Sequence, residues 1–122
     1  MSPYRGYKED ECLAKLGGLL GCEFKSQGKY CPLDGIADTA CCEIKQRNVF
    51  KDTFPTTIIG KNKIDYWKKH FPDIPLYFFV RFDDGDYYYR WNDADDITLD
   101  KGGLKHKPRE YYFVPKELLV EF

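Results

Sequence analysis

The stretch DGIADTACCEIK, residues 34–45, decides how this chain of 122 residues is interpreted. A tight turn at residues 38–39 divides it, so the segments on either side fold back against each other. Side chains alternate between the two faces of a strand, which places Glu43 and Lys45 on one face, about 6.6 Å apart along the strand. The returning hairpin brings Asp34 next to Glu43. The sequence therefore predicts two carboxylates and an amine gathered at one point of a sheet.

This grouping predicts a site for a hard divalent cation. Two carboxylates repel each other unless a cation lies between them, and the backbone carbonyl of Ile44 adds a third oxygen. Such a set suits Mg²⁺, with Mn²⁺ as a substitute. Lys45 would lie beside the cation, where partial burial lowers the pKa of its amine and suits it to proton transfer or to contact with a phosphate. The alternative interpretation is a salt-bridged strand face, because Glu-x-Lys is common on strands.

The residues before the hairpin predict a helix over residues 7–20. Its apolar side chains recur every three or four positions and form one stripe: Cys12, Leu13, Leu16, Leu19 and Leu20. Glu9 falls on the same arc as Leu13, Leu16 and Leu20, whereas Glu11 points to the opposite side. A carboxylate on a core-facing stripe needs a partner, which makes Glu9 a candidate for the site. Alternatively, Glu9 is one of the acids that the helix dipole favours in a first turn.

The remaining pattern predicts an α/β or α+β domain: one mixed β-sheet flanked by helices, in the order α-β-β-β-α-β-β. Extended segments are expected over residues 22–25, 30–37, 40–47, 76–82, 87–91 and 111–114, and a second helix over residues 58–71. Residues 83–86 are expected to form a hairpin turn, residues 92–108 a polar loop and residues 116–119 a short final turn. The length suits a single domain spanning residues 1–122.

Aromatic residues make up 17% of the chain, and many fall on the predicted strands 76–82 and 87–91. Core packing is favoured for them, because alternate residues of paired strands face inward. The exposed half has two other interpretations, a platform that stacks on unpaired bases or a dimer contact.

The composition excludes several classes of protein. A chain that is 43% hydrophobic and rich in aromatic residues is not disordered. A net charge of −1 excludes a uniformly basic DNA-binding protein. No apolar run reaches the roughly 20 residues that span a bilayer, and no secretory signal is visible, so we expect no membrane association and a cytoplasmic, reducing location.

The five cysteines have no Cys-x-x-Cys pair, which favours buried thiols over a metal site. A zinc site is the alternative, and it would use Cys22, Cys31, Cys41 and Cys42 with His70 or His106.

Residues 32–35 (PLDG) and 42–47 (CEIKQR) resemble the PD-(D/E)XK nuclease motif, in the form found in small Holliday-junction-resolvase-like and phage-type endonucleases. In these families an acid of the first helix joins the metal site, and residues 9–16 resemble its surroundings, with Glu9 as the acid. One departure is Pro-x-Asp in place of Pro-Asp. The resemblance covers residues 9–82 and implies a restriction-endonuclease-like core.

The resemblance also implies an activity, the metal-dependent hydrolysis of phosphodiester bonds in DNA by an endonuclease. Asp34, Glu43, Glu9 and the Ile44 carbonyl would hold one or two Mg²⁺ ions, and Lys45 would orient the attacking water or stabilise the charge that grows on the phosphate.

Basic residues that follow the motif are candidates for DNA contact. They are Arg47, Lys51, Lys61 and Lys63, with Lys63 favoured over Lys61 as the basic residue that begins the second helix in the family. Selectivity for a DNA structure such as a junction or a nick is left open, as is host or phage origin, although the compact size suits a phage nuclease.

Two rival functions are retained. The first is a catalytically inactive nuclease-fold module that binds nucleic acid or serves in assembly, and the second is a zinc-stabilised interaction domain. Resolvase-like proteins often act as dimers, so a homodimer is an arrangement to test.

Overall fold

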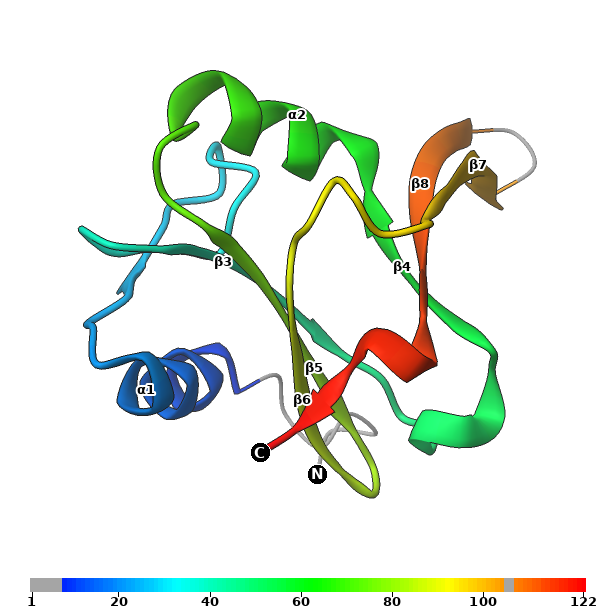
Figure 1. Ribbon diagram of the computed structural model, residues 1–122, viewed down its shortest axis with the longest axis horizontal. Coiled ribbons are helices and arrows are strands. Elements are labelled where there is room, and N and C mark those ends of the chain that lie inside the picture. The colour runs from blue at the N-terminus through cyan, green and yellow to red at the C-terminus, as the bar shows by residue number, and fades with distance from the viewer. Residues whose placement is uncertain (1–7, 105–106) are drawn as a thin grey trace.

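The computed structural model of the protein describes residues 8–104 and 107–122 (Figure 1). Along the chain the elements are α1 (Glu9–Leu20), β1 (Lys25–Ser26), β2 (Gly35–Ile36), β3 (Cys41–Gln46), η1 (Lys51–Thr53), β4 (Thr56–Gly60), α2 (Lys61–His70), β5 (Leu76–Phe82), β6 (Gly85–Arg90), β7 (Thr98–Leu104), β8 (Lys107–Pro115), η2 (Lys116–Leu118) and β9 (Val120–Glu121). Within the described ranges, no helix combines the length and apolar character needed to cross a membrane.

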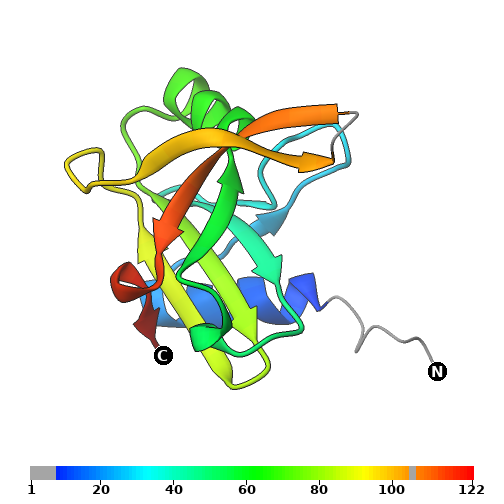
Figure 2. The same cartoon turned by 90° about the vertical axis from the view of Figure 1, so that its right-hand side faces the viewer.

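The larger sheet is mixed, with the strand order β1-β2-β3-β5-β6-β9. Its central strands β3 and β5 are parallel, and its other neighbouring strands are antiparallel. Helix α1 lies on one side of this sheet, whereas α2 and the β4-β8-β7 sheet lie on the other (Figures 1 and 2). The predicted α+β architecture, a mixed sheet flanked by helices, is confirmed.

Apolar side chains on both faces of the larger sheet build the core. On the α1 face, Leu13 and Leu16 pack with Ile44 and Phe79. On the opposite face, Ile64 of α2 belongs to a second buried cluster, which also contains Leu33, Cys41, Ile59, Leu76, Phe78, Val80 and Val114. Strand β3 therefore buries side chains on both of its faces, which is typical of a central parallel strand.

Helix α1 follows the predicted stripe, with one exception. Cys12, Leu13 and Leu16 are buried, but Leu19 is 48% exposed because it lies outside the arc that faces the sheet. The helix ends at Gly21, whose φ of 71° is the left-handed conformation that glycine adopts readily. The predicted first residue of this helix, Tyr7, lies outside the described residues.

Several predicted elements are wrong in their extent. The extended segments expected over residues 22–25 and 30–37 give strands of only two residues each, β1 and β2. The second helix was expected from residue 58, but residues 58–60 belong to β4, where Ile58 and Ile59 pair with β8. The run of β-branched residues from Thr56 to Ile59 favours a strand, and helix α2 begins only after Gly60.

The expected loop over residues 92–108 contains strand β7, which pairs with β8. These two strands and β4 form a second, three-stranded antiparallel sheet beyond the single sheet that was predicted. Strands β4, β7 and β9 are additions to the predicted elements, whereas β8 contains the strand that was expected over residues 111–114.

Most aromatic residues of β5 and β6 belong to the core, as the sequence favoured, whereas Tyr77 and Tyr88 are half-buried. Phe78, Phe79, Phe82, Tyr87 and Tyr89 are all buried. Each is less than 10% exposed, so these rings are not available as a platform for bases.

Candidate active site

The β2–β3 hairpin brings Asp34 to Glu43 as predicted. Residues 37–40 close the turn through a hydrogen bond from Ala37 N–H to the Ala40 carbonyl, 2.8 Å between N and O. Gly35 then pairs with Cys42, so Asp34, one residue earlier, lies opposite Glu43. The Asp34 carboxylate accepts a hydrogen bond from the Ile44 N–H at 2.8 Å, which fixes Asp34 against the strand that carries Glu43.

Glu43 is a buried acid with an unusual environment. It is 9% exposed, and its Oε1 atom is buried without a hydrogen-bond partner in the part of the chain that the structure describes. Burial raises the pKa of Glu43 to about 9, and the neighbouring Asp34 acts in the same direction, while Lys63 opposes both. A buried carboxyl group next to a second acid binds a proton, unless a metal cation takes the place of that proton.

Lys45 lies on the same face of β3 as Glu43 and shares a cavity with it. Its Nζ atom donates a long hydrogen bond of 3.4 Å to the Ile58 carbonyl of β4. Burial lowers the pKa of the Lys45 amine, and the charges of Arg47 and Lys63 lower it further, against the opposing effect of Glu43. The amine is therefore closer to releasing a proton than an exposed lysine would be.

Lys63 extends from α2 to the same acid. Its Nζ atom lies 3.2 Å from Glu43 Oε2, and the side chain is 27% exposed. The same amine donates a hydrogen bond to the Pro32 carbonyl, in the segment that leads to Asp34. Lys63 thus connects α2 to both carboxylate-bearing segments.

Glu9, in the first turn of α1, lies near this group on the side of β1. Its Oε1 atom accepts a hydrogen bond of 3.1 Å from the Ser26 hydroxyl. Burial raises the pKa of Glu9; the Ser26 hydrogen bond opposes this, and the negative charges of Asp34 and Asp10 add to it. The interaction with Asp34 places Glu9 in the electrostatic neighbourhood of the carboxylate pair.

A cavity of about 210 Å³ opens on the α2 side of Glu43, and we call it the Glu43 cavity. Besides Glu43, Lys45 and Lys63, its lining includes Ile58, Ile59, Gly60, Asn62, Phe78, Arg109, Glu110 and Tyr111. The last three come from β8 and Asn62 comes from α2, and sequence reasoning missed all four. The three residues of β8 directly follow residues 92–108, where no apolar alternation indicates a strand.

The other predicted DNA contacts lie outside the lining of the Glu43 cavity. Arg47 stacks its guanidinium over Phe54, 5.5 Å from the ring centroid, and Lys51 places its amine over Tyr87 at 5.1 Å. Lys61 forms an ion pair with Asp65, 2.6 Å between Nζ and Oδ2. The structure thus brings together Asp34, Glu43, Lys45 and Lys63, with Glu9 close by.

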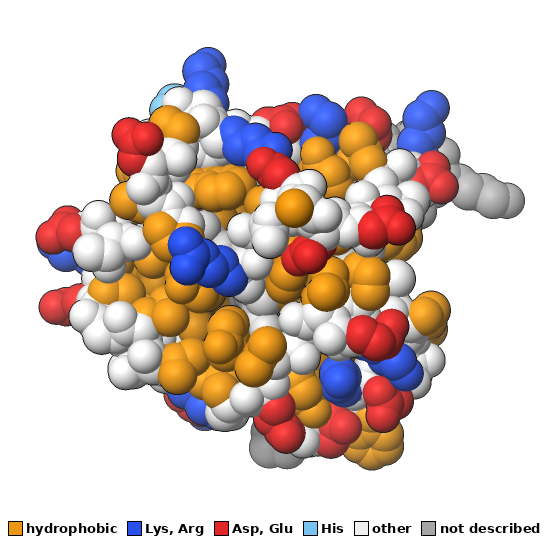
Figure 3. Space-filling view, viewed as in Figure 1, with side chains coloured by type: hydrophobic (Ala, Val, Ile, Leu, Met, Phe, Trp, Pro, Cys, Tyr) orange, Lys and Arg blue, Asp and Glu red, His pale blue; other side chains and the backbone are white. Residues whose placement is uncertain are grey.

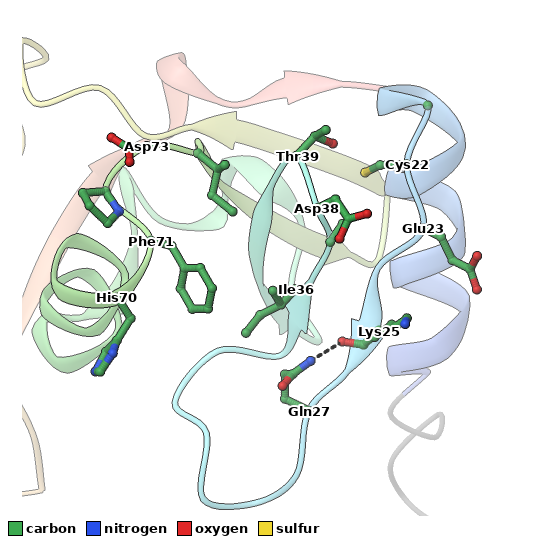
Figure 4. A pocket seen from close by; sticks show the side chains of 14 residues that line it. Cys22, Glu23, Lys25, Gln27, Ile36, Asp38, Thr39, His70, Phe71 and Asp73 are labelled. Atoms are coloured by element: carbon green, nitrogen blue, oxygen red, sulfur yellow. Dashed lines mark hydrogen bonds between the residues drawn. The ribbon is translucent and has the colours of Figure 1, made fainter.

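A larger hollow of about 830 Å³ lies elsewhere, between the end of α1 and the end of α2 (Figure 4). Cys22 and His70, two ligands of the alternative zinc site, lie at opposite sides of it. All five cysteines are free thiols. His106 lies outside the described residues, and among those described the cysteines and His70 do not assemble into a metal-binding group.

The carboxylate pair fits a divalent cation by its chemistry. No three His, Cys, Asp or Glu side chains of the described chain are grouped to hold a metal ion, so a cation bound by this pair would need further oxygen ligands from the backbone or from a more distant acid. The buried, unpartnered Oε1 atom of Glu43 is the observation that favours a cation, because a hard cation would satisfy it.

Comparisons with known proteins support the fold. No protein-family model matches the chain, and no curated protein sequence matches it. Among solved structures, the chain is similar to Hjc, a Holliday junction resolvase from the archaeal hyperthermophile Archaeoglobus fulgidus. The TM-score is 0.56 at 11% sequence identity, and the match covers 89% of this chain and 88% of that chain. The fold is therefore restriction-endonuclease-like, as the sequence predicted.

Proposed function

We propose that this chain is a metal-dependent DNA endonuclease that hydrolyses phosphodiester bonds. The observation that carries the proposal is the juxtaposition of Asp34 with the buried Glu43, whose Oε1 atom has no partner among the described residues. Lys45 follows on the same strand face. The likeness to a resolvase fold supports the same conclusion, because a nuclease motif on a nuclease-like fold is a more specific signal than either alone.

Asp34 and Glu43, with the Ile44 carbonyl and Glu9, would hold Mg²⁺ or Mn²⁺. When bound, such a cation supplies Lewis-acid polarisation of the phosphate and lowers the pKa of a water molecule. Glu43 must lose its proton for this role, because a carboxylate binds a metal ion in its ionised form.

Besides the carboxylates that would bind the metal, Lys45 would take part in the reaction through its amine. Lys45 lines the Glu43 cavity, and burial lowers the pKa of its amine, so this amine could hold a water molecule or contact a phosphate oxygen there. The Lys63 amine lies 3.2 Å from Glu43 Oε2 and would offset the charge of this carboxylate when no divalent cation is bound. Lys45 of β3 and Lys63 of α2 therefore both line the cavity that Glu43 lines.

The substrate is DNA, and we propose selectivity for branched or nicked structures. The test uses a four-way junction, a nicked duplex, an intact duplex and a single strand of common sequence, each with Mg²⁺, Mn²⁺ or EDTA. We expect cleavage with either metal and none in EDTA. Binding of DNA without cleavage of any substrate would instead support an inactive nuclease-fold binding module.

A homodimer would carry two such sites and could cut both strands of a duplex. Light scattering in solution, with and without DNA, measures the oligomeric state directly. A monomer in both conditions would contradict paired cleavage by one dimer.

A further inference from the structure

The three-stranded sheet brings a hairpin to the opening of the Glu43 cavity. We call the pair β7 and β8 the arm. Strand β8 contacts α2, and Figures 1 and 2 show the arm beside the beginning of that helix. Arg109, Glu110 and Tyr111 of β8 line the Glu43 cavity. The arm is therefore part of the wall of the candidate active site.

A second cavity, of about 590 Å³, continues from the first along the arm. It is lined by Lys61, Asn62, Asp65, Lys101, Arg109 and Glu110, and we call it the arm cavity. Asn62, Arg109 and Glu110 line both cavities, so the two are adjacent. A ligand that enters the Glu43 cavity therefore has a continuous polar path along the arm.

Arg109 is a cation of this path that is not paired with another described side chain. Its cross-strand neighbour is Gly102, which has no side chain to pair with it. The residue is exposed, and no ion pair or hydrogen bond joins its guanidinium to another described residue. By contrast, Lys61 is paired with Asp65, and Lys63 with Glu43.

The beginning of α2 adds to this positive environment. Its N-cap residue, Gly60, makes no side-chain capping hydrogen bond. The first turn carries no acid, although acids are favoured at that position, and instead carries Lys61 and Lys63. Basic and acidic side chains are interspersed over α2 and the arm in Figure 3, and basic residues outnumber acidic ones among those lining the two cavities.

We propose that the arm binds the DNA backbone and that Arg109 holds a phosphate next to the one that is cleaved. The planar guanidinium matches a phosphate in a bidentate manner, and a free arginine beside the site is available for it. This inference rests on the proposed function. It assigns to the arm the contact with this neighbouring phosphate. Arg47 and Lys51 line neither cavity and are therefore not placed for this contact.

The experiment measures DNA binding without cleavage, by fluorescence anisotropy at several salt concentrations in a Mg²⁺ buffer. All proteins carry Glu43→Gln so that cleavage does not interfere. Arg109→Gln is compared with Arg90→Gln, an exposed arginine on β6 that lines neither cavity. We expect Arg109→Gln to weaken binding roughly threefold to tenfold and to reduce the salt slope by about 0.9, the loss of one phosphate contact. Arg90→Gln should change neither, and Arg109→Lys should keep the slope, because it keeps the charge.

Wild-type affinity and slope in Arg109→Gln, or equal losses in Arg90→Gln, would overturn the inference. Cleavage by the protein without Glu43→Gln, measured separately, tests the proposed function on its own. If that protein cleaves DNA while Arg109→Gln binds normally, only the role of the arm fails. If Arg109→Gln binds weakly but no metal supports cleavage, the arm is supported and the nuclease function fails.

Discussion

The Nζ atom of Lys63 lies 3.2 Å from Oε2 of Glu43, so an amine of α2 is ion-paired with the buried acid of β3. The same amine is bonded to the Pro32 carbonyl, two residues before Asp34. One lysine therefore holds the two carboxylate-bearing segments near each other. In a buried site, such a cation offsets the repulsion that otherwise separates two acids.

This pair predicts energetic coupling between Lys63 and Glu43. We expect Lys63→Met to lower the free energy of unfolding by about 1–2 kcal/mol, and by about 1 kcal/mol less when Glu43→Gln is also present. The coupling should be larger at pH 9.5 than at pH 7, because burial and Asp34 raise the pKa of Glu43 to about 9. A denaturant double-mutant cycle in EDTA at both pH values measures it. Strict additivity at pH 9.5 would show that the pair is not energetically coupled.

The burial of Glu43 predicts a stability that falls as pH rises. Its pKa is raised from the ordinary value of 4.5 to about 9, so the folded protein keeps a proton that the unfolded chain has lost between these values. This contribution is fully present below pH 4.5 and is lost progressively up to about pH 9. In EDTA, Glu43→Gln should therefore be more stable than the wild type at pH 8, by about 2 kcal/mol, and nearly equal to it at pH 5.

Thermal unfolding at the two pH values checks this, with Glu23→Gln as the matched control. Glu23 is exposed and lies outside the Glu43 cavity, so its variant should follow the wild type at both pH values. A Glu43→Gln variant that is less stable than the wild type at pH 8 would contradict the assigned environment.

The hydrogen bond between Ile44 N–H and Asp34 predicts that two substitutions at Asp34 separate structure from metal binding. Asp34→Asn keeps an oxygen acceptor, so its stability should stay close to that of the wild type. Asp34→Ala leaves the Ile44 N–H without this partner and should lose about 1–2 kcal/mol. Both variants should lose Mn²⁺ binding in calorimetry, because neither has a carboxylate. Retention of Mn²⁺ binding by Asp34→Asn would remove Asp34 from the metal site.

Lys45 is expected to affect cleavage and not metal binding. Its amine shares the Glu43 cavity but is not a metal ligand, so Lys45→Ala should lower the cleavage rate roughly 100-fold or more while Mn²⁺ affinity stays within about twofold. Lys69→Ala, at an exposed position near the end of α2, is the control. Full cleavage activity of Lys45→Ala would contradict the proposed role of the Lys45 amine in cleavage.

The sequence predicted the hairpin site because its signals are local. The turn at residues 38–39 and the alternation along β3 place Asp34, Glu43 and Lys45 without reference to any distant segment. The helical wheel likewise singled out Glu9, because Glu9 falls on the arc of Leu13 and Leu16 and this pattern is local to α1. The general fold followed from the same apolar periodicity.

Strand β7 of the arm was missed for the opposite reason, whereas the strand expected over residues 111–114 is part of β8. Strand β7 includes polar residues and glycines, and it exists because it pairs with β8, whose own partner β4 is far away in the chain. Pairing of distant strands depends on tertiary structure and leaves little periodic signal when the strand is exposed. The same effect moved the beginning of α2 from residue 58 to Lys61, because β8 holds Ile58 and Ile59 in a strand.

The most direct test of the proposed site is the cleavage of end-labelled junction DNA with Mn²⁺ by the wild type, Glu43→Gln and Glu23→Gln. We predict that the wild type and Glu23→Gln cleave at equal rates, that EDTA abolishes both reactions, and that Glu43→Gln is slower by roughly 100-fold or more. Cleavage by Glu43→Gln at the wild-type rate would contradict the assignment of Asp34 and Glu43 as the metal-binding pair of a nuclease.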